Sequence, residues 1–292
     1  MKGEYWLTAA ILIVLLVALT YSHLLQFNSR YVENLELSLQ SPEQLSITSA
    51  DNDHSSESNS PRVAIVIDDL GWELGTISLY EQVPAPLTMA LMPERPHSDY
   101  HYQLWRDKYE FIIHMPMEPL GYPDDDPGEH ALMTDMNREE IIAKVEEVID
   151  LYPRLVGMNN HMGSAFVRYR PGMEAVMKTL GEHNIFYLDS RTDDASVAAE
   201  SARKYGVPVE ESDVFLDGQT DKEHIRGQFE SLMQVAKRQG EAIGIGHIQT
   251  PNTARVLNEM VPKYKQKGIE FVYLSELFEL APLRRRIFTS DN

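Results

Sequence analysis

Short apolar runs alternate with longer amphipathic segments from residue 62 to residue 282 of this 292-residue chain. Eight of these runs are typical of buried strands, and they lie at 63–67, 87–91, 111–113, 155–158, 185–188, 214–216, 242–246 and 271–274. Strand–helix alternation repeated this often predicts an α/β fold with a parallel sheet and crossover helices. With about seven or eight strands, the pattern fits a closed or nearly closed barrel as well as an open sheet.

The amphipathic segments carry signals that mark where helices begin and end. Segment 137–152 places its apolar residues on one face, as an amphipathic helix does. Pro171 suits the first turn of a second helix, and Asp221 can cap a third. Pro262 is expected to kink or break a fourth, because proline has no N–H to donate. No linker interrupts these elements, so residues 62–282 are predicted to form one domain.

Residues 1–28 are predicted to be a membrane anchor or a cleaved signal peptide. The mostly apolar stretch from Trp6 to Leu25 just reaches the length of about 20 residues that a helix needs to span a bilayer. Lys2 precedes it, as expected for a cytoplasmic N-terminus. Residues 20–22 form only a passable cleavage site, so an uncleaved anchor is preferred. Either interpretation places the rest of the chain outside the inner membrane, in the periplasm.

Residues 29–61 are predicted to be a flexible linker, because the stretch 40–62 is rich in Ser, Asp, Glu and Asn and cannot bury enough apolar surface to become ordered. Residues 283–292 are predicted to be a C-terminal tail. The 45 acidic and 26 basic residues give a formal charge of −19, which repels phosphate backbones, so we expect no nucleic-acid partner. The absence of cysteine excludes disulfides and thiolate zinc sites, and it fits an exported protein.

Polar side chains follow the predicted strands at the points where the strands end. These residues are Asp68 and Asp69, His114, Asn159 to His161, Asp189 to Arg191, Asp217 and His247. In parallel α/β folds the C-terminal strand ends meet at one face, where ligands bind. We therefore expect these side chains to gather there. Asp217 is the exception, since an aspartate after a strand commonly caps the next helix.

The adjacent carboxylates of Asp68 and Asp69 repel each other, so a cation is expected beside them. An arginine or a divalent metal would serve. His114, His161 and an aspartate are ligand types that suit zinc with an open position for water. Manganese, cobalt or nickel would also fit. The sequence therefore predicts a divalent metal site, with zinc as the leading candidate.

Two other polar segments receive plainer interpretations. The acidic stretch 123–129 lacks the spacing of a calcium loop and is expected to be a solvated loop. His97 and His101 lie among aromatic residues and could line a sugar-binding rim. A surface helix is the preferred interpretation of that segment.

Five strings of the sequence resemble the divergent polysaccharide deacetylases, which are distant relatives of the carbohydrate esterase family 4 deacetylases. They are residues 67–71 (IDDLG), 114–119 (HMPMEP), 159–164 (NNHMGS), 188–192 (LDSRT) and 246–247 (GH). The resemblance covers residues 61–282 in order, and the second and third strings are the specific ones. It implies a distorted (β/α) barrel of about seven strands. It also implies a metal-dependent hydrolase that removes N-acetyl groups from a polysaccharide or peptidoglycan.

The resemblance implies roles for individual residues. Asp68 matches the catalytic base, Asp69 a metal ligand and His247 the general acid. The second histidine of the classical metal motif is absent, because Glu118 stands four residues after His114. Two nearby prolines also argue against a helix there. The third ligand must therefore be Glu118 or come from another segment.

His161 is the preferred third ligand, beside Asp69 and His114. Arg191 is expected to hold Asp68 through a charge-assisted hydrogen bond. Side chains that remain candidates for substrate contacts or a secondary site are Glu118, Asn159, Asn160 and Asp189.

Two other functions use the same residues. One is a catalytically weak or inactive envelope protein that binds glycan or peptidoglycan, and the other is a hydrolase of a different ester or amide. The full set of polar strand ends favours an enzyme, whereas the missing second histidine favours the binding protein.

Overall fold

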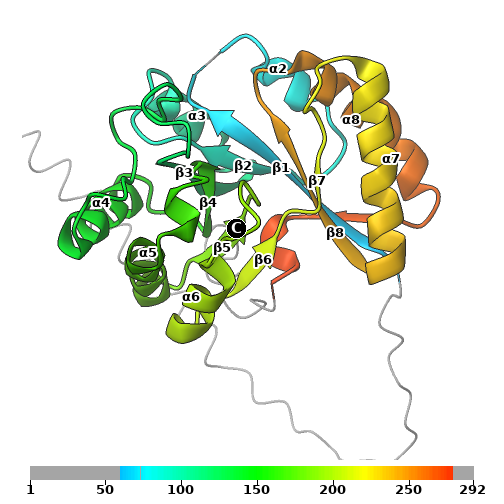
Figure 1. Cartoon of the computed structure of the whole chain (residues 1–292). Helices are drawn as coiled ribbons and strands as arrows, with labels where there is room; N and C mark the ends of the chain where they lie inside the picture. Colours follow the sequence, from blue (N-terminus) through cyan, green and yellow to red (C-terminus); the bar gives the residue numbers. More distant parts are fainter. Residues whose placement is uncertain (1–59, 73, 279–292) are drawn as a thin grey trace, which may run out of the picture. The chain divides into compact units, whose positions relative to one another are not determined.

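The computed structural model describes residues 60–72 and 74–278 (Figure 1). The predicted anchor or signal segment, the linker as far as residue 59, and the C-terminal tail lie outside the described residues. In the part of the chain that is described, no helix is both long enough and apolar enough to cross a bilayer.

One sheet of nine strands forms the centre of the domain (Figure 1). The strands are β1 (Arg62–Leu70), β2 (Thr88–Leu91), β3 (Glu110–Met117), β4 (Gly157–Met162), β5 (Phe186–Asp189), β6 (Val209–Glu211), β7 (Val214–Phe215), β8 (Glu241–His247) and β9 (Glu270–Val272). Their order is β6-β5-β4-β3-β2-β1-β8-β7, and β9 pairs with the start of β1. All these pairings are parallel, which confirms the prediction from strand–helix alternation.

The sheet curls so far that its two edge strands, β6 and β7, are consecutive in the chain. β6 and β7 stand at opposite ends of the strand order, yet only residues 212 and 213 separate them in the chain. Ser212 N donates to Asp189 O of β5 (3.0 Å), and Asp213 N donates to Ile243 O of β8 (2.9 Å). The barrel-like α/β form is therefore confirmed. Its strands outnumber the expected seven or eight, because β6 is a Val-Glu-Glu segment with no apolar run to reveal it.

The helices lie outside the curled sheet (Figure 1). They are α2 (Ile77–Tyr80), α3 (Ser98–Trp105), α4 (Arg138–Leu151), α5 (Arg170–His183), α6 (Ala198–Tyr205), α7 (Lys222–Gln239) and α8 (Pro251–Lys265), with 3-10 turns η1 (Phe166–Arg168) and η2 (Leu274–Glu276). Asp221 caps α7 as predicted, because its side chain accepts a hydrogen bond from His224 N (2.9 Å). Pro171 lies in the first turn of α5, also as predicted.

The expected break at Pro262 does not occur, since α8 continues to Lys265. A proline at this position removes the hydrogen bond to the carbonyl of Asn258. Both residues lie on the exposed face of the helix, where water can satisfy that carbonyl. Only one further turn has to form beyond Pro262, so packing of the buried face retains it.

Residues of β1 alternate between two cores. Val63, Ile65 and Ile67 pack in the larger core with residues of the surrounding helices. Ala64 and Val66 belong to a second core of strand residues and the C-terminal segment, which identifies it as the interior of the curled sheet. This alternation follows from the two-residue period of a strand.

The C-terminal segment fills one end of that interior. Phe278 stacks on Phe186 with a centroid separation of 4.1 Å. Ser275 N, in η2, donates to the buried Glu110 carboxylate (3.0 Å). Because Glu110 is the first residue of β3, this segment lies toward the N-terminal strand ends. A site can therefore form only at the opposite end of the interior, where the polar residues stand at the C-terminal ends of the strands.

Candidate metal and catalytic site

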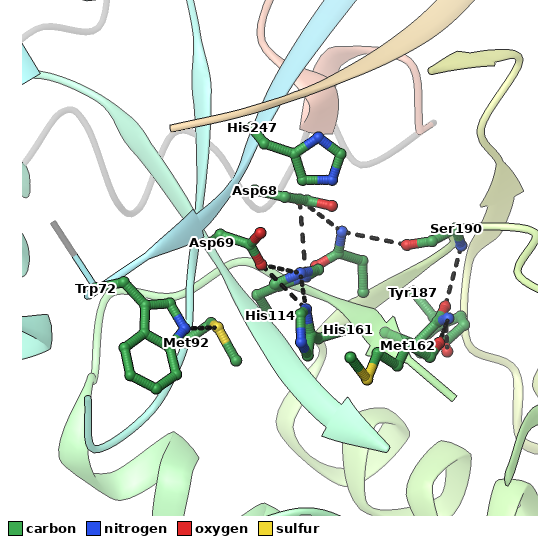
Figure 2. Close-up of polar contacts among 12 residues, drawn as sticks. Asp68, Asp69, Trp72, Met92, His114, His161, Met162, Tyr187, Ser190 and His247 are labelled. Atoms are coloured by element: carbon green, nitrogen blue, oxygen red, sulfur yellow. Dashed lines mark hydrogen bonds and ion pairs between the residues drawn. The ribbon is translucent and has the colours of Figure 1, made fainter. Parts of the chain in front are cut away.

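Asp68 and Asp69 face the same cluster although they are adjacent in β1 (Figure 2). In a regular strand, neighbouring side chains point to opposite faces. Here the register between β1 and β2 shifts between Ile67 and Leu70, and Asp69 has a left-handed backbone with φ of 66°. Such a bulge re-aims a side chain. A non-glycine residue in that conformation costs on the order of 1–3 kcal/mol, which fits a site whose geometry is held by its surroundings.

Asp69, His114 and His161 bring three ligand atoms together (Figure 2). Asp69 Oδ1 lies 3.2 Å from His114 Nε2 and 3.0 Å from His161 Nδ1. The two nitrogen atoms are 3.1 Å apart. Ligands bound to one ion at about 2.0–2.2 Å are separated from each other by roughly 3 Å. The triangle therefore has the size that a divalent cation needs.

The chemistry of this triangle also suits a cation. Asp69 Oδ1 is buried and accepts no hydrogen bond of acceptable geometry, although both imidazoles are close. Burial acts to raise the pKa of Asp69, but the two neighbouring imidazoles of His114 and His161 outweigh it and lower that pKa. The carboxylate is therefore ionised. A buried anionic oxygen without a donor is a group that a metal ion would satisfy.

Asn159 fixes which nitrogen of His114 faces the triangle. Its Nδ2 donates to Asp68 Oδ1 (2.9 Å), so its Oδ1 accepts from His114 Nδ1 (2.8 Å). With the proton on Nδ1, the lone pair of Nε2 points toward Asp69 and His161. An outer partner that orients a ligating histidine in this way is usual in metal sites. The sequence marked Asn159 only as a possible substrate contact.

Gln249 orients the carboxylate of the triangle from the other side. Its Nε2 donates to Asp69 Oδ2 at 2.7 Å, which leaves Oδ1 directed at the two imidazoles. No sequence signal singled out Gln249. It stands two residues after the predicted strand end at His247, so examination of the whole loop after that strand could have found it.

Asp68 lies beside the triangle as the base candidate. It is 1% exposed, and its Oδ1 is 3.7 Å from His114 Nδ1 in addition to its bond with Asn159. Burial raises the pKa of Asp68, and the neighbouring His114 and His247 only partly offset that effect. A carboxylate with a raised pKa is a stronger proton acceptor than a solvated one.

His247 is paired with Asp217 at the neighbouring strand end. His247 Nδ1 donates to Asp217 Oδ1 (2.7 Å), and Asp217 Oδ2 accepts from His247 N (2.8 Å) and from Thr253 Oγ1 (2.7 Å). Burial acts to lower the pKa of His247, but Asp217 and Asp68 outweigh it and raise it to about 9. The predicted helix cap at Asp217 is therefore wrong. Asp221 caps α7, and Asp217 orients and charges His247.

Arg191 does not hold Asp68 as predicted. Its side chain is half-exposed, and its Nε lies 3.5 Å from Glu211 Oε2. Asn159 occupies the position beside Asp68 instead. Arg191 comes after the end of β5 in a left-handed conformation, with φ of 55°. The chain has therefore already turned away from the strand direction there.

Glu118 does not join His114. Its carboxylate accepts from Thr134 N (2.5 Å) and so holds the loop that precedes α4. The four residues from His114 to Glu118 run along and just beyond β3, where each residue advances by about 3.3 Å. A helix would place such a pair side by side, whereas a strand separates it by roughly 13 Å.

Asn160 and Asp189 face away from the site and have internal partners. Asn160 Oδ1 accepts from Tyr187 Oη (3.1 Å) and Ser190 N (3.0 Å). Asp189 accepts from Arg191 N (2.8 Å) and from Ser196 Oγ (2.6 Å). Both residues organise the loops beside the site, and neither carboxyl nor amide is directed at the triangle.

His101 is buried, which contradicts the expectation of a surface helix for its segment. The helix exists as α3, but the His101 side chain is 0% exposed and its Nδ1 accepts from Gly71 N (3.1 Å). Gly71 follows the two aspartates closely in the chain. His101 therefore supports the loop that carries them, and it does not line a surface rim.

The sequence and the fold of this chain are similar to those of known proteins. Residues 65–278 match the family model described as divergent polysaccharide deacetylase. The uncharacterized protein YibQ of Escherichia coli (strain K12) is 35% identical over 202 residues, which are 68% of this chain and 62% of YibQ. An uncharacterized protein of Haemophilus influenzae is 33% identical over 197 residues, 67% of this chain and 69% of that protein. The match to YibQ thus leaves more than a third of that relative uncovered.

A solved structure shares the fold. The crystal structure of the uncharacterized protein ATU2773 from Agrobacterium tumefaciens C58 has a TM-score of 0.71 and 24% identity, over 76% of this chain and 91% of that chain. This likeness supports the architecture described above.

Proposed function

The chain belongs to the divergent polysaccharide deacetylases, and from that premise we propose that its domain hydrolyses N-acetyl groups of an envelope polysaccharide or peptidoglycan. The observation that carries the proposal is the triangle of Asp69, His114 and His161, with a buried base candidate and a protonated histidine beside it. These are the parts that amide hydrolysis by a metal-dependent enzyme requires.

The triangle would hold a divalent metal ion through Asp69 Oδ1, His114 Nε2 and His161 Nδ1. Imidazole and carboxylate ligands suit zinc, which is our first choice. When bound, such an ion supplies a Lewis acid that polarises the acetamide carbonyl and acidifies the attacking water. Gln249 holds Asp69 Oδ2 and Asn159 holds His114 Nδ1, so Asp69 Oδ1 and His114 Nε2 stay directed at the centre of the triangle, where they would bind the ion.

Asp68 acts as the general base. It accepts a proton from the water whose oxygen attacks the carbonyl carbon of the acetamide. Its raised pKa and its position beside the triangle suit that step. The hydrogen bond from Asn159 leaves its second oxygen available for the water.

His247 acts as the general acid. With a pKa of about 9 it carries a proton at neutral pH, and Asp217 holds Nδ1 so that Nε2 is the nitrogen that faces outward. The proton passes from Nε2 to the amine nitrogen as the C–N bond breaks. The products are acetate and a free amino sugar.

We also propose that the domain works in the periplasm, tethered to the inner membrane by residues 6–25. The support is the apolar stretch from Trp6 to Leu25 and the lack of cysteine. Such a location would place the site beside the polymers of the cell envelope.

Metal analysis of the purified full chain, combined with acetate release from acetylated chitooligosaccharides and peptidoglycan fragments, tests the function. We expect about one divalent ion per chain. His161→Ala should lose both metal and activity, whereas His183→Ala, which changes an exposed histidine on α5, should lose neither. Metal-free wild type with no acetate release under any of several added metals would contradict the proposal. Glycan binding under those conditions would favour a binding protein.

A further inference from the structure

Most of the exposed large apolar side chains of the described residues lie at the C-terminal end of the sheet, where the candidate site is. Among the described residues, nine large apolar side chains are exposed, and six of them stand at or just beyond C-terminal strand ends. These six are Trp72, Leu74, Leu120, Tyr122, Met162 and Phe215. The other three, Tyr100, Leu104 and Leu151, lie on α3 and α4. Exposed apolar groups that cluster around a polar site mark a binding surface.

These six side chains form the rim of the site, and contacts hold Trp72 in a fixed position within it. Its Nε1 lies 3.1 Å from Met92 Sδ, and Arg95 Cζ lies 4.5 Å from the centroid of its ring. Arg95 is itself held, since Nη2 donates to Pro127 O (2.9 Å). The indole is therefore anchored at its edge and covered on one face by a guanidinium group.

The backbone that carries Trp72 is also fixed. Gly71 N donates to the buried His101, and Gly71 O accepts from His97 N (2.9 Å). Gly71 has φ of +123°, and a Cβ there would lie 2.5 Å from Ser98 Oγ, so glycine is required. Two contacts hold the Trp72 side chain directly, and three more fix Arg95 and Gly71 beside it, while Trp72 remains 48% exposed. A rigid aromatic surface of this kind gives contact area to a ligand at a low entropic cost.

Trp72 lies beside the candidate metal site. It follows Asp69 by three residues, and Figure 2 shows its indole on one side of the Asp69–His114–His161 triangle and Met162 on the other. A chain-like ligand that presents one unit to the triangle would place a neighbouring unit over the rim. The face of the indole opposite Arg95 is the flat surface available to that unit.

We propose that Trp72 stacks on the pyranose ring next to the sugar that is deacetylated, so that the site takes an uncharged, N-acetylated glycan chain of several units. This inference rests on the proposed function and names the ligand class. The electron-rich face of an indole attracts the positively polarised C–H groups of a sugar ring, as it attracts cations. A formal charge of −19 and the aspartates at 124–126 disfavour a polyanion.

Calorimetric binding of an uncharged β-1,4-linked N-acetylglucosamine tetramer to the full chain tests this assignment. An Asp68→Asn background prevents turnover during the titration. We expect Trp72→Ala to weaken binding of the tetramer about tenfold, as loss of an aromatic stacking partner does. Trp72→Phe should restore part of it, and the monosaccharide should show almost no difference. Tyr100→Ala is the matched control, because Tyr100 is an aromatic residue with 55% exposure outside the rim.

The outcomes separate this inference from the proposed function. Equal tetramer affinity in Trp72→Ala and Tyr100→Ala would overturn the stacking role, even if acetate release and metal content stand. Loss of binding to anionic lipid vesicles in Trp72→Ala, with tetramer binding unchanged, would also overturn it and assign the rim to a membrane surface. Unchanged metal content of Trp72→Ala shows that any loss arises from the glycan contact.

Discussion

Asp217 Oδ1 accepts a hydrogen bond from His247 Nδ1 at 2.7 Å, and the two residues lie at the C-terminal ends of the neighbouring strands β7 and β8. The aspartate side chain is fully buried, whereas that of the histidine is partly exposed toward the site. This pair fixes both the charge and the direction of the proposed general acid. It also makes the stability of the domain depend on pH.

The first prediction concerns that pH dependence. The folded-state pKa of His247 is raised from 6.5 to about 9, so protonated His247 stabilises the fold. This contribution is complete below pH 6.5 and is lost as the pH rises through about 9. Thermal unfolding of the chelator-treated full chain should therefore show a melting temperature that falls across this window. Asp217→Asn should flatten the fall, and equal slopes in both proteins would refute the assignment.

The second prediction concerns the base. Asp68→Asn keeps the shape of the side chain and removes its ability to accept a proton. Acetate release should fall by roughly 10²–10⁴, the usual contribution of a positioned base. Metal content should stay near that of wild type, because Asp68 is not one of the three ligands. Glu118→Gln is the control, since the structure places that carboxylate on Thr134 N and away from the triangle. A similar rate for both variants would exclude Asp68 as the base.

The third prediction concerns Asn159, which joins Asp68 to His114. Asn159→Ala removes the acceptor that fixes the His114 tautomer and also the donor to Asp68. Metal affinity should fall by about 10–100-fold, as it does when a ligand loses its outer partner. Competition with a chromogenic chelator measures this. Asn258→Ala, on the exposed face of α8, should leave the affinity unchanged. An undiminished affinity in Asn159→Ala would show that the ligand needs no such support.

The fourth prediction concerns Gln249, the donor to Asp69 Oδ2. Gln249→Ala frees the carboxylate to rotate, so metal affinity should fall, although by less than the roughly 10²-fold limit for an outer partner. Gln249→Glu should be worse, because a second negative charge would face Asp69 Oδ2. Gln234→Ala on the exposed face of α7 is the comparison. If the glutamate variant binds metal as tightly as wild type, Gln249 does not touch Asp69 in solution.

Much of the fold and half of the site follow from local pattern. The strand–helix alternation predicts a parallel sheet. The apolar face of segment 137–152 predicts α4, Pro171 marks the start of α5, and Asp221 marks the start of α7. The two-residue period of a strand also predicts which polar residues at the strand ends point into the curled sheet and which point outward. His114 lies two residues after Ile112, which points into the curled sheet, so it points the same way. His247 likewise points to the same side as Ile243 and Ile245. The same period puts Asn160 on the outer face of the sheet. Its absence from the candidate site could therefore have been predicted from the sequence.

The sequence by itself determined that acidic and imidazole side chains would meet at one end of a curled parallel sheet, because parallel strands share their C-terminal edge. Only the tertiary structure decided how they pair. A bulge brings Asp69 to the side of Asp68, the neighbouring position of β7 and β8 gives Asp217 to His247, and Asn159 takes the place predicted for Arg191. Each of these depends on contacts between segments far apart in the chain. Local periodicity contains no information on such contacts, since it describes one strand at a time.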